Sequence, residues 1–292
     1  MLPIASSVRV RTREILDADR PAVARLLTEG FRRSTVENWF EIFDRLAVHQ
    51  TPAGLPKYGY LIESEGVPVG AILIISSTVR NDNVSSIRCN LSSWYVSPSY
   101  RSFAHLFMSR VLKRNEITFV NVSAAPHTFP IIQAQGFSRY SNGQFFAITL
   151  PLVSRGDTQV KVLPAGEISD GRFDAFEREL LHTHAQYGCM SICCTTRDQS
   201  YPFVFRLRVL KGILPCAQLI YCRNIEEFVR FSGPIGRFLA RRGRPLMMVD
   251  ANGAIPGLVG IYIDGMLPRY YKGPMPPRLG DLAYTESALF GI

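Results

Sequence analysis

The sequence predicts an α/β protein with a mixed, twisted sheet flanked by helices and arranged as two tandem lobes. Three observations predict this fold class. The composition, 47% hydrophobic and 20% charged, is typical of a globular protein rather than a disordered one. The segment from Val84 to Tyr140 reads as strand, turn, helix, strand, helix and strand. A similar order of strand, helix, hairpin, helix and strand recurs after residue 159.

The length of 292 residues suits one large or two ordinary domains. No apolar run approaches the roughly 18 residues of a membrane-spanning helix. The N-terminus has no apolar core behind a basic start, as a signal peptide would have. We therefore expect a cytoplasmic protein with no membrane partner.

The formal net charge is +9, and it divides almost evenly between residues 1–150 and the remainder. An even spread argues against a single nucleic-acid-binding face. A mild positive charge suits a protein that binds an anionic cofactor, and it equally suits one that is merely soluble.

Three of the six cysteines lie close together at Cys189, Cys193 and Cys194. Their spacing matches no common zinc knuckle, and no second pair of cysteines two residues apart follows. His182 and His184 lie two apart, so on a helix they would face different sides. We expect buried free thiols, no disulfide framework and no metal.

The first part of the chain begins with a strand at Val8–Arg13 and a helix that has Pro21 in its first turn and ends at Gly30. A second amphipathic helix contains Trp39 and Phe43, whose rings either line a pocket or belong to the core; the core is the stronger expectation. The further expected strands are Tyr58–Glu63, Val69–Thr78, Val84–Val96, Ile117–Val122 and Gln144–Leu150, and the further helices are Ser102–Arg114 and Pro126–Ala134.

The segment Pro151–Thr158 is rich in Pro, Ser, Gly and Asp and is the expected domain boundary. It separates a first lobe, residues 1–150, from a second lobe, residues 159–292. The second lobe is expected to contain strands at Val160–Val162, Phe203–Val209, Ile213–Cys222 and Pro245–Asp250, helices at Ser169–Gln186 and Ile225–Leu239, and a tail of loops with one or two edge strands. The helix at Ile225–Leu239 is expected to be interrupted at Ser232-Gly233-Pro234.

The turn after the Val84–Val96 strand is the most informative segment. A helix opening at Ser102 would direct unpaired backbone N–H groups and a positive dipole end at the space above the strand, which makes a phosphate site. Val96-Ser97-Pro98-Ser99-Tyr100-Arg101 matches the first half of the motif V-x-P-x-Y-R-G-x-G-x-G/A, and Gly136-Phe137 matches its later closing pair. In this motif and in element order, residues 8–150 resemble the GNAT superfamily of acyl-CoA N-acyltransferases, and the second lobe resembles a degenerate copy.

The resemblance implies transfer of an acyl group from acetyl-CoA or another acyl-CoA to an amine or hydroxyl of an unspecified small-molecule or protein acceptor. It implies that the pantetheine arm pairs with the strand ahead of the turn and that the pyrophosphate lies at the helix start. The implied cofactor-binding residues are Trp94, Tyr95 and Val96 on the strand, and Arg101, Ser102, Phe103, Ala104 and His105 at the helix start.

Two departures from the family pattern leave the catalytic residues unassigned. Ser102 and Ala104 carry side chains where the family prefers glycine, which lets a phosphate approach the backbone more closely. Ile132 stands where many members have a tyrosine that protonates the leaving thiolate. His127 could titrate near neutrality, although a histidine at a helix start is more often a plain surface residue. The alternative hypothesis is a non-catalytic acyl-CoA-binding or interaction protein.

A second possible anion site is the segment Arg230–Gly236. It places two glycines before a helical run with Arg237, Arg241 and Arg242. A glycine loop before a basic helix can bind an anion. The competing interpretation is a simple helix break, because glycine and proline interrupt helices routinely.

Overall fold

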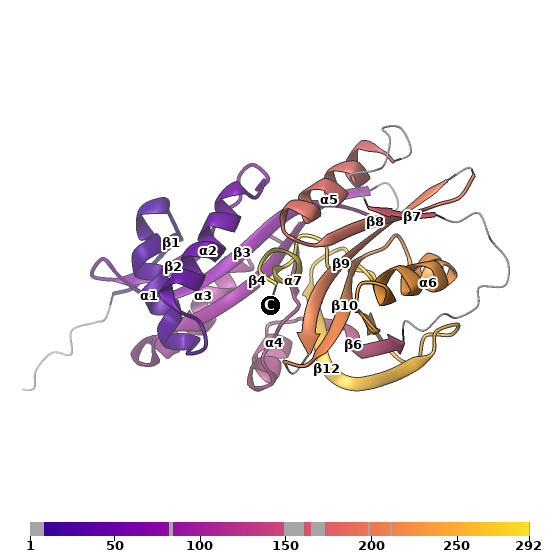
Figure 1. Cartoon of the computed structure of the whole chain (residues 1–292). Helices are drawn as coiled ribbons and strands as arrows, with labels where there is room; N and C mark the ends of the chain where they lie inside the picture. Colours follow the sequence, from indigo (N-terminus) through magenta and orange to yellow (C-terminus); the bar gives the residue numbers. More distant parts are fainter. Residues whose placement is uncertain are drawn as a thin grey trace, which may run out of the picture. The chain divides into compact units, whose positions relative to one another are not determined.

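The computed structural model describes residues 9–81, 84–148, 161–164, 173–197, 199–210 and 212–291. The chain forms two compact units, each built from strands and helices (Figure 1). The first unit contains Met1–Asn121 and Lys272–Met275, and the second contains Val122–Tyr271 and Pro276–Ile292. The mixed α/β class expected from the sequence is confirmed.

The first unit contains a sheet with the strand order β1-β2-β3-β4-β5. Neighbouring strands are antiparallel except β4 and β5, which are parallel. Its strands are β1 (Arg11–Glu14), β2 (Gly59–Ser64), β3 (Val67–Asn81), β4 (Val84–Val96) and β5 (Thr118–Asn121); its helices are α1 (Arg20–Gly30), α2 (Val36–Val48) and α3 (Ala104–Val111), with short 3-10 helices η1 (Asp17–Asp19) and η2 (Pro98–Phe103).

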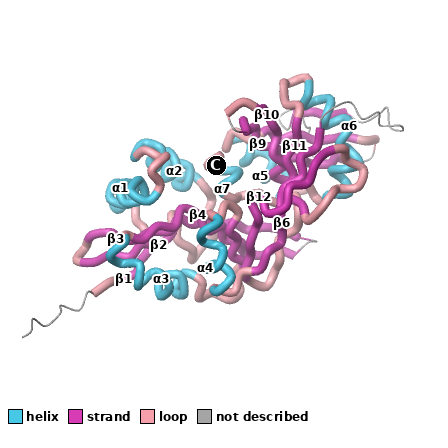
Figure 2. The backbone as a smooth tube through the Cα atoms, turned by 90° about the horizontal axis from the view of Figure 1, so that it is seen from below, coloured by secondary structure: helices cyan, strands magenta, loops and turns pink. Residues whose placement is uncertain are grey.

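Helices α1 and α2 lie on one side of this sheet and α3 on the other (Figure 2). The Thr35 side chain starts α2 by accepting a hydrogen bond from the backbone N–H of Asn38, which satisfies one of the donors that a helix start leaves open. Trp39 and Phe43 of α2 are buried, so the core interpretation holds for both rings.

The second unit contains a sheet with the strand order β12-β6-β11-β10-β9-β8-β7. All pairs are antiparallel except β10 and β11, which are parallel. Its strands are β6 (Ser138–Ile148), β7 (Lys161–Pro164), β8 (Met190–Thr195), β9 (Ser200–Leu210), β10 (Leu214–Tyr221), β11 (Leu246–Ala251) and β12 (Gly260–Lys272); its helices are α4 (Phe129–Ala134), α5 (Ala175–Gln186), α6 (Ile225–Ala240) and α7 (Glu286–Leu289), with the 3-10 helix η3 (Pro126–Thr128).

The two units repeat one connection. In the first unit β4 leads through η2 and α3 to its parallel neighbour β5, and in the second β10 leads through α6 to its parallel neighbour β11. Parallel neighbours need such a helical crossover because a tight turn cannot join them. Both units therefore share this crossover, whereas relative to the order expected from the sequence the second unit has an additional strand, β8, ahead of its hairpin β9–β10.

The core of the second unit lies between α6 and one face of the sheet. Phe228, Phe231 and Leu239 of α6 pack with Phe203 and Phe205 of β9 in a single buried cluster. Helix α5 covers the opposite face, where the Ser191 hydroxyl of β8 donates a hydrogen bond to the carbonyl of Leu181. The two faces of the sheet are thus distinct, because successive strand residues point to opposite sides.

Several expectations need correction. Arg230–Gly236 is not a loop: α6 runs without interruption through Pro234, and Ser232, Gly233 and Gly236 are buried within it. The helix expected at Ser102–Arg114 begins with η2 at Pro98 and ends at Val111. Strand β8 was not expected at all.

The expected boundary Pro151–Thr158 lies outside the described residues. The division at residues 150 and 159 therefore stays a prediction, and β6 belongs to the second compact unit. Among the described helices, none is long and apolar enough to cross a membrane.

Candidate functional site

The end of β4 presents one free edge. Strand β4 pairs with β5 only at Arg88, Cys89 and Asn90, whereas its pairing with β3 continues to Val96. Strand β5 ends at Asn121, and no strand of the described residues pairs with Leu91–Val96 on that side. Backbone N–H and C=O groups along such an edge are ready to pair with an extended ligand or peptide.

A β-bulge lies within this free edge. Ser92 pairs with Leu73 and Tyr95 pairs with Ala71, so three steps on β4 oppose two on β3. Ser93 has a left-handed backbone with φ of 52°. A bulge bends the strand and redirects the side chains that follow it. Bulges are common next to active sites, which makes this end of β4 a candidate functional site.

The bulge fixes the direction of Tyr95. Its ring lies so close to Gly30, the last residue of α1, that a Cβ atom at Gly30 would overlap the ring. The glycine at position 30 therefore leaves room for the Tyr95 ring, in addition to ending α1. Tyr95 therefore packs on the face of the sheet that α1 covers.

The turn after β4 is held by the backbone. The Ser97 N–H donates to the carbonyl of Val69 at 2.8 Å, and the Tyr100 N–H donates to the carbonyl of Ser97 at 2.9 Å. The Ala104 N–H donates to the carbonyl of Arg101. This donor is consequently not available to a phosphate, and the open N–H groups of this helical segment lie earlier, near Ser99.

The predicted cofactor-binding residues follow one another along β4, η2 and the start of α3. Val96 is buried, whereas Arg101, Ser102 and His105 are exposed. Trp94, Tyr95, Phe103 and Ala104 are partly buried. No hydrogen bond or ion pair joins Arg101 to another described residue, so its guanidinium is free to meet an anion.

Two polar atoms near this edge lack partners, and sequence reasoning did not identify them. The Oδ1 atom of Asn90 and the Nε1 atom of Trp94 are buried without a hydrogen bond to the described residues. Asn90 is only 1% exposed. A buried polar atom without a partner is costly, and such atoms are frequently completed by a ligand or water. The sequence carries no signal for them beyond a polar residue in an apolar strand.

The candidate proton donors lie in and beside α4. Ile132 is buried and cannot transfer a proton. His127 lies in η3 and is exposed. Gly136 follows the end of α4 with φ of 83°, and the Phe137 N–H donates to the carbonyl of Ile132, so the Gly-Phe pair forms a helix cap. The structure therefore gives Gly136-Phe137 a structural role.

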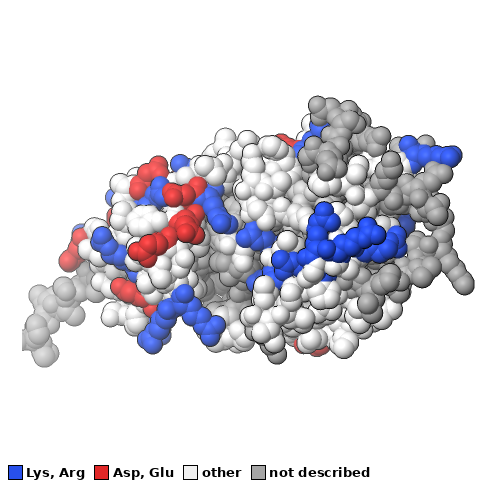
Figure 3. Space-filling model, viewed as in Figure 1, with Lys and Arg blue, Asp and Glu red and all other residues white. Residues whose placement is uncertain are grey.

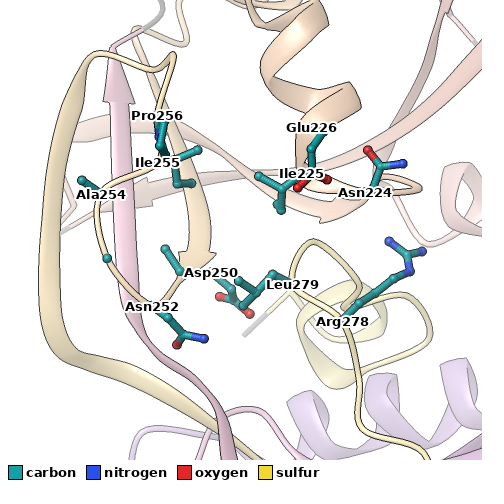
Figure 4. Close-up of a pocket in the computed structure, with 12 residues that line it drawn as sticks. Asn224, Ile225, Glu226, Asp250, Asn252, Ala254, Ile255, Pro256, Arg278 and Leu279 are labelled. Atoms are coloured by element: carbon teal, nitrogen blue, oxygen red, sulfur yellow. The ribbon is translucent and has the colours of Figure 1, made fainter.

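The second unit has a pocket of about 480 Å³ near the start of α6. Figure 4 shows Ile225 and Glu226 of α6, Asp250 of β11 and Arg278 facing the same space. The Asp250 carboxylate accepts hydrogen bonds from Arg269 at 3.0 Å and from Gln144 at 2.7 Å, so its charge is already balanced. Arg278 donates to the carbonyl of Cys222.

The thiols and histidines of the second unit have structural environments. The five cysteines of the second unit are buried, and none of them forms a disulfide. Burial raises the pKa of Cys222 to about 12, so its thiol is protonated at neutral pH. His184 of α5 is fully buried: its Nε2 accepts from the Tyr284 N–H, so its Nδ1 must carry the proton donated to the carbonyl of Leu180.

Comparison with solved structures identifies the fold. No family model and no curated protein sequence matches the chain. A GCN5-related N-acetyltransferase from Anabaena variabilis is similar at 10% identity and a TM-score of 0.59, covering 90% of this chain and 72% of that one. A candidate acetyltransferase from Pyrococcus horikoshii is similar at 12% identity and a TM-score of 0.55, covering 97% of this chain and 96% of that one.

A GCN5-related N-acetyltransferase from Kribbella flavida gives a TM-score of 0.54 at 14% identity, covering 91% of this chain and 71% of that one. The similarity therefore extends across nearly the whole sequence, while the identities are too low to transfer an activity. With its parallel pair β4–β5 and the helical turn between them, the chain has the fold of the GNAT superfamily of GCN5-related N-acetyltransferases.

Proposed function

We propose that the protein is an acyl-CoA-dependent acyltransferase that moves an acyl group to an amine or hydroxyl, and that acyl-CoA binds at the end of β4. The observation that carries this proposal is the free edge Leu91–Val96, which bends at Ser93 and leads directly into η2. The cytoplasm stays the proposed location, and the acceptor is a small molecule or a protein.

The free edge suits the pantetheine arm of coenzyme A. That arm contains two amide groups, which can hydrogen-bond to a strand edge as an added strand would. Trp94, Tyr95 and Val96 supply the backbone groups. The Trp94 Nε1 atom, buried without a partner, is a further donor beside this edge.

The exposed turn suits the pyrophosphate. Arg101 and Ser102 are exposed, and no described residue pairs with the Arg101 guanidinium. The partial positive charge at the start of a helical segment attracts an anion, and the open N–H groups lie near Ser99. Phe103, Ala104 and His105 complete the proposed binding segment, and His105 is exposed on the first turn of α3.

The chemistry would be direct attack in a ternary complex. The acceptor nitrogen or oxygen forms a bond to the thioester carbon, the carbon–sulfur bond breaks, and the thiolate receives the proton that the acceptor loses. Backbone N–H groups near Tyr95 and Val96 would polarise the thioester carbonyl. Because Ile132 cannot transfer a proton, the proton would reach the sulfur directly from the acceptor, through water, or through a residue such as His127 or Tyr100.

A non-catalytic acyl-CoA-binding protein is the second candidate. Two observations favour it: Ile132 is buried where a proton donor would stand, and the Ala104 N–H is committed to the carbonyl of Arg101. A thiolate is a weak base and leaves readily without a proton. We therefore expect the loss of a general acid to lower the rate by a factor near the lower end of the usual range of about 100-fold to 10,000-fold. Turnover without an acid is therefore feasible.

The Arg101→Glu variant tests the binding site. It places a repelling charge where the pyrophosphate is proposed, and we expect at least about tenfold weaker binding of acetyl-CoA by calorimetry. Arg25→Glu is the matched control, because Arg25 is an exposed arginine of α1 with the same change of charge. Equal affinities in the two variants, both with normal melting temperatures, would remove acyl-CoA from this turn.

An assay of free thiol separates the two candidate functions. Purified protein is incubated with acetyl-CoA and a panel of amines and alcohols, and coenzyme A release is followed. Release that depends on an acceptor supports the enzyme. Saturable acetyl-CoA binding without release for any acceptor supports the non-catalytic protein.

A further inference from the structure

The sheet of the second unit carries a basic cluster on the face opposite α6. Phe203 and Phe205 of β9 point to the α6 core, so the alternation of the strand turns Arg206 and Arg208 to the other face. Gln218 of β10 lies directly across from Arg206 in the register. Strands β9 and β10 lie side by side in Figure 1.

Arg208 is a partly buried cation without a counter-ion. Its Nη1 donates to Oε1 of Gln218 at 2.9 Å, and no carboxylate of the described residues forms an ion pair with it. Burial lowers the pKa of its guanidinium, and the positive charges of Arg269 and Arg206 lower this pKa further, against an opposing effect of the Cys216 thiol. Placing a charge in a partly buried site without a partner is unfavourable.

The neighbouring groups do not neutralise this charge. The Asp250 carboxylate is bonded to Arg269 through three contacts between 3.0 and 3.2 Å, which balances that pair alone. Arg206 donates to the carbonyls of Tyr187 and Ala288, which satisfies its hydrogen bonds but leaves its positive charge. Among the described residues, neither Arg206 nor Arg208 forms an ion pair with a carboxylate.

Gln218 adds an unmet hydrogen-bond donor. Its side chain is only 1% exposed, and its Nε2 atom has no partner among the described residues. The orientation of the amide is fixed, because a guanidinium only donates and the amide oxygen must face Arg208. The amide NH₂ group is thus buried, not bonded to Arg208, and without an acceptor among the described residues.

We propose that Arg208 and Gln218 bind an oxyanion, the carboxylate or phosphate group of a small-molecule ligand, on this face of the second unit. Both side chains offer only donors there, and an oxyanion supplies the missing acceptors together with the missing negative charge. The proposal concerns a different unit from the acyl-CoA site and does not depend on acyl transfer.

The test uses the full chain without coenzyme A. Inorganic phosphate and acetate are titrated separately at constant ionic strength, and the melting temperature and heat of binding are measured. A ligand that binds the native state raises the melting temperature in a saturable way. The two titrations distinguish a phosphate from a carboxylate, and saturation by neither anion would overturn the proposal.

Arg208→Gln removes the charge, and we expect it to weaken binding of the anion about tenfold or more. The matched control is Arg237→Gln, which removes the same charge from the exposed surface of α6. A similar loss in both variants would show general charge attraction and would contradict a defined site.

The Gln218→Glu variant tests the same anion site independently, and it applies even if Arg208→Gln folds poorly. It is nearly isosteric and supplies an internal carboxylate to Arg208. We expect this variant to have a higher melting temperature than the wild type without anion, and to show no further stabilisation by phosphate or acetate. A variant that still responds to the anion as the wild type does would rule out Gln218 as a ligand.

Discussion

His49 shows how one residue makes the stability of the first unit depend on pH. It follows the end of α2, and its buried Nε2 lies 2.8 Å from the carbonyl oxygen of Ser76 and 3.2 Å from the Ser77 hydroxyl. Burial lowers the pKa of His49 below its ordinary value of 6.5, against the opposing effect of the bond to Ser76. The native state therefore favours the neutral ring more strongly than the unfolded chain does.

Proton linkage determines whether the free energy of unfolding rises or falls with pH. Below pH 6.5 the unfolded chain protonates His49 more readily than the native state does, so the free energy of unfolding falls as the pH falls. We predict that His49→Gln, which keeps a donor for Ser76, loses less stability than the wild type between pH 7.5 and 5.5. Over this interval the difference is at most about 1.4 kcal/mol, because most of it arises in the one pH unit below 6.5. Urea titrations at both pH values measure it, and equal losses would exclude His49 as the cause.

At the scale of the element, α6 combines a helix breaker with a continuous helix. Pro234 has no N–H to donate to the carbonyl one turn earlier, yet the helix continues because Phe231, Ile235 and Leu239 are anchored in the core. Residues 228–249 contain five arginines and no acidic residue. Figure 3 shows a row of basic side chains in the region of α6. The apolar face of α6, which packs into the core, therefore holds the helix through Pro234.

Replacement of Pro234 by alanine tests this view. Proline inside a helix costs about 3 kcal/mol relative to alanine, so we expect Pro234→Ala to raise the melting temperature. Pro130→Ala is the control: Pro130 lies in the first turn of α4, where the N–H has no helical partner in any case, and we expect little change. A drop in melting temperature for Pro234→Ala would mean that the core packing requires the proline.

The elements differ in how far the sequence could predict them. Strand β4 has the expected bounds Val84–Val96, because its apolar pattern lies between polar turn residues. The prediction that the α6 helix is interrupted near Pro234 was wrong. Packing of the helix in the core outweighs the tendency of proline to break a helix locally. Strand β8 was missed because its short segment Met190–Thr195 is rich in cysteine and serine and has few of the β-branched and aromatic residues that indicate a strand.

The candidate site was predictable in position and not in detail. The half-motif ending at Tyr100-Arg101 located the turn after β4. The bulge at Ser93 was not foreseeable, because a left-handed serine has no sequence signature comparable to that of glycine. The start of η2 at Pro98 also escaped, since a 3-10 turn merging into a helix leaves no separate capping residue.

At the scale of the whole molecule, the chain passes between the two compact units three times, after Asn121, Tyr271 and Met275. Lys272–Met275 belongs to the first unit, where the Met275 N–H donates to the Thr118 hydroxyl at 3.1 Å. Strand β6 pairs with β11 on one side and β12 on the other. Each compact unit is therefore assembled from segments that are not contiguous in the sequence.

This arrangement predicts the outcome of limited proteolysis. We expect trypsin to cut first at Arg155 in the expected boundary segment, because such Pro- and Gly-rich segments are preferred sites of nicking. The fragments 1–155 and 156–292 should nevertheless elute together in gel filtration, because β6 from the first fragment is hydrogen-bonded to β11 and β12 of the second. Two separate peaks without denaturant would contradict that pairing.

The position of β6 between two later strands has a consequence during synthesis of the chain. Both partners of β6 lie about 100 residues or more downstream, at Leu246–Ala251 and Gly260–Lys272, so β6 leaves the ribosome with neither edge covered. An uncovered strand is a template for pairing with other chains. At a synthesis rate of about 5 to 20 residues per second, β6 stays unpaired for several seconds or longer before its partners emerge. We expect a chaperone that covers β6, or slower expression, to raise the yield of folded protein.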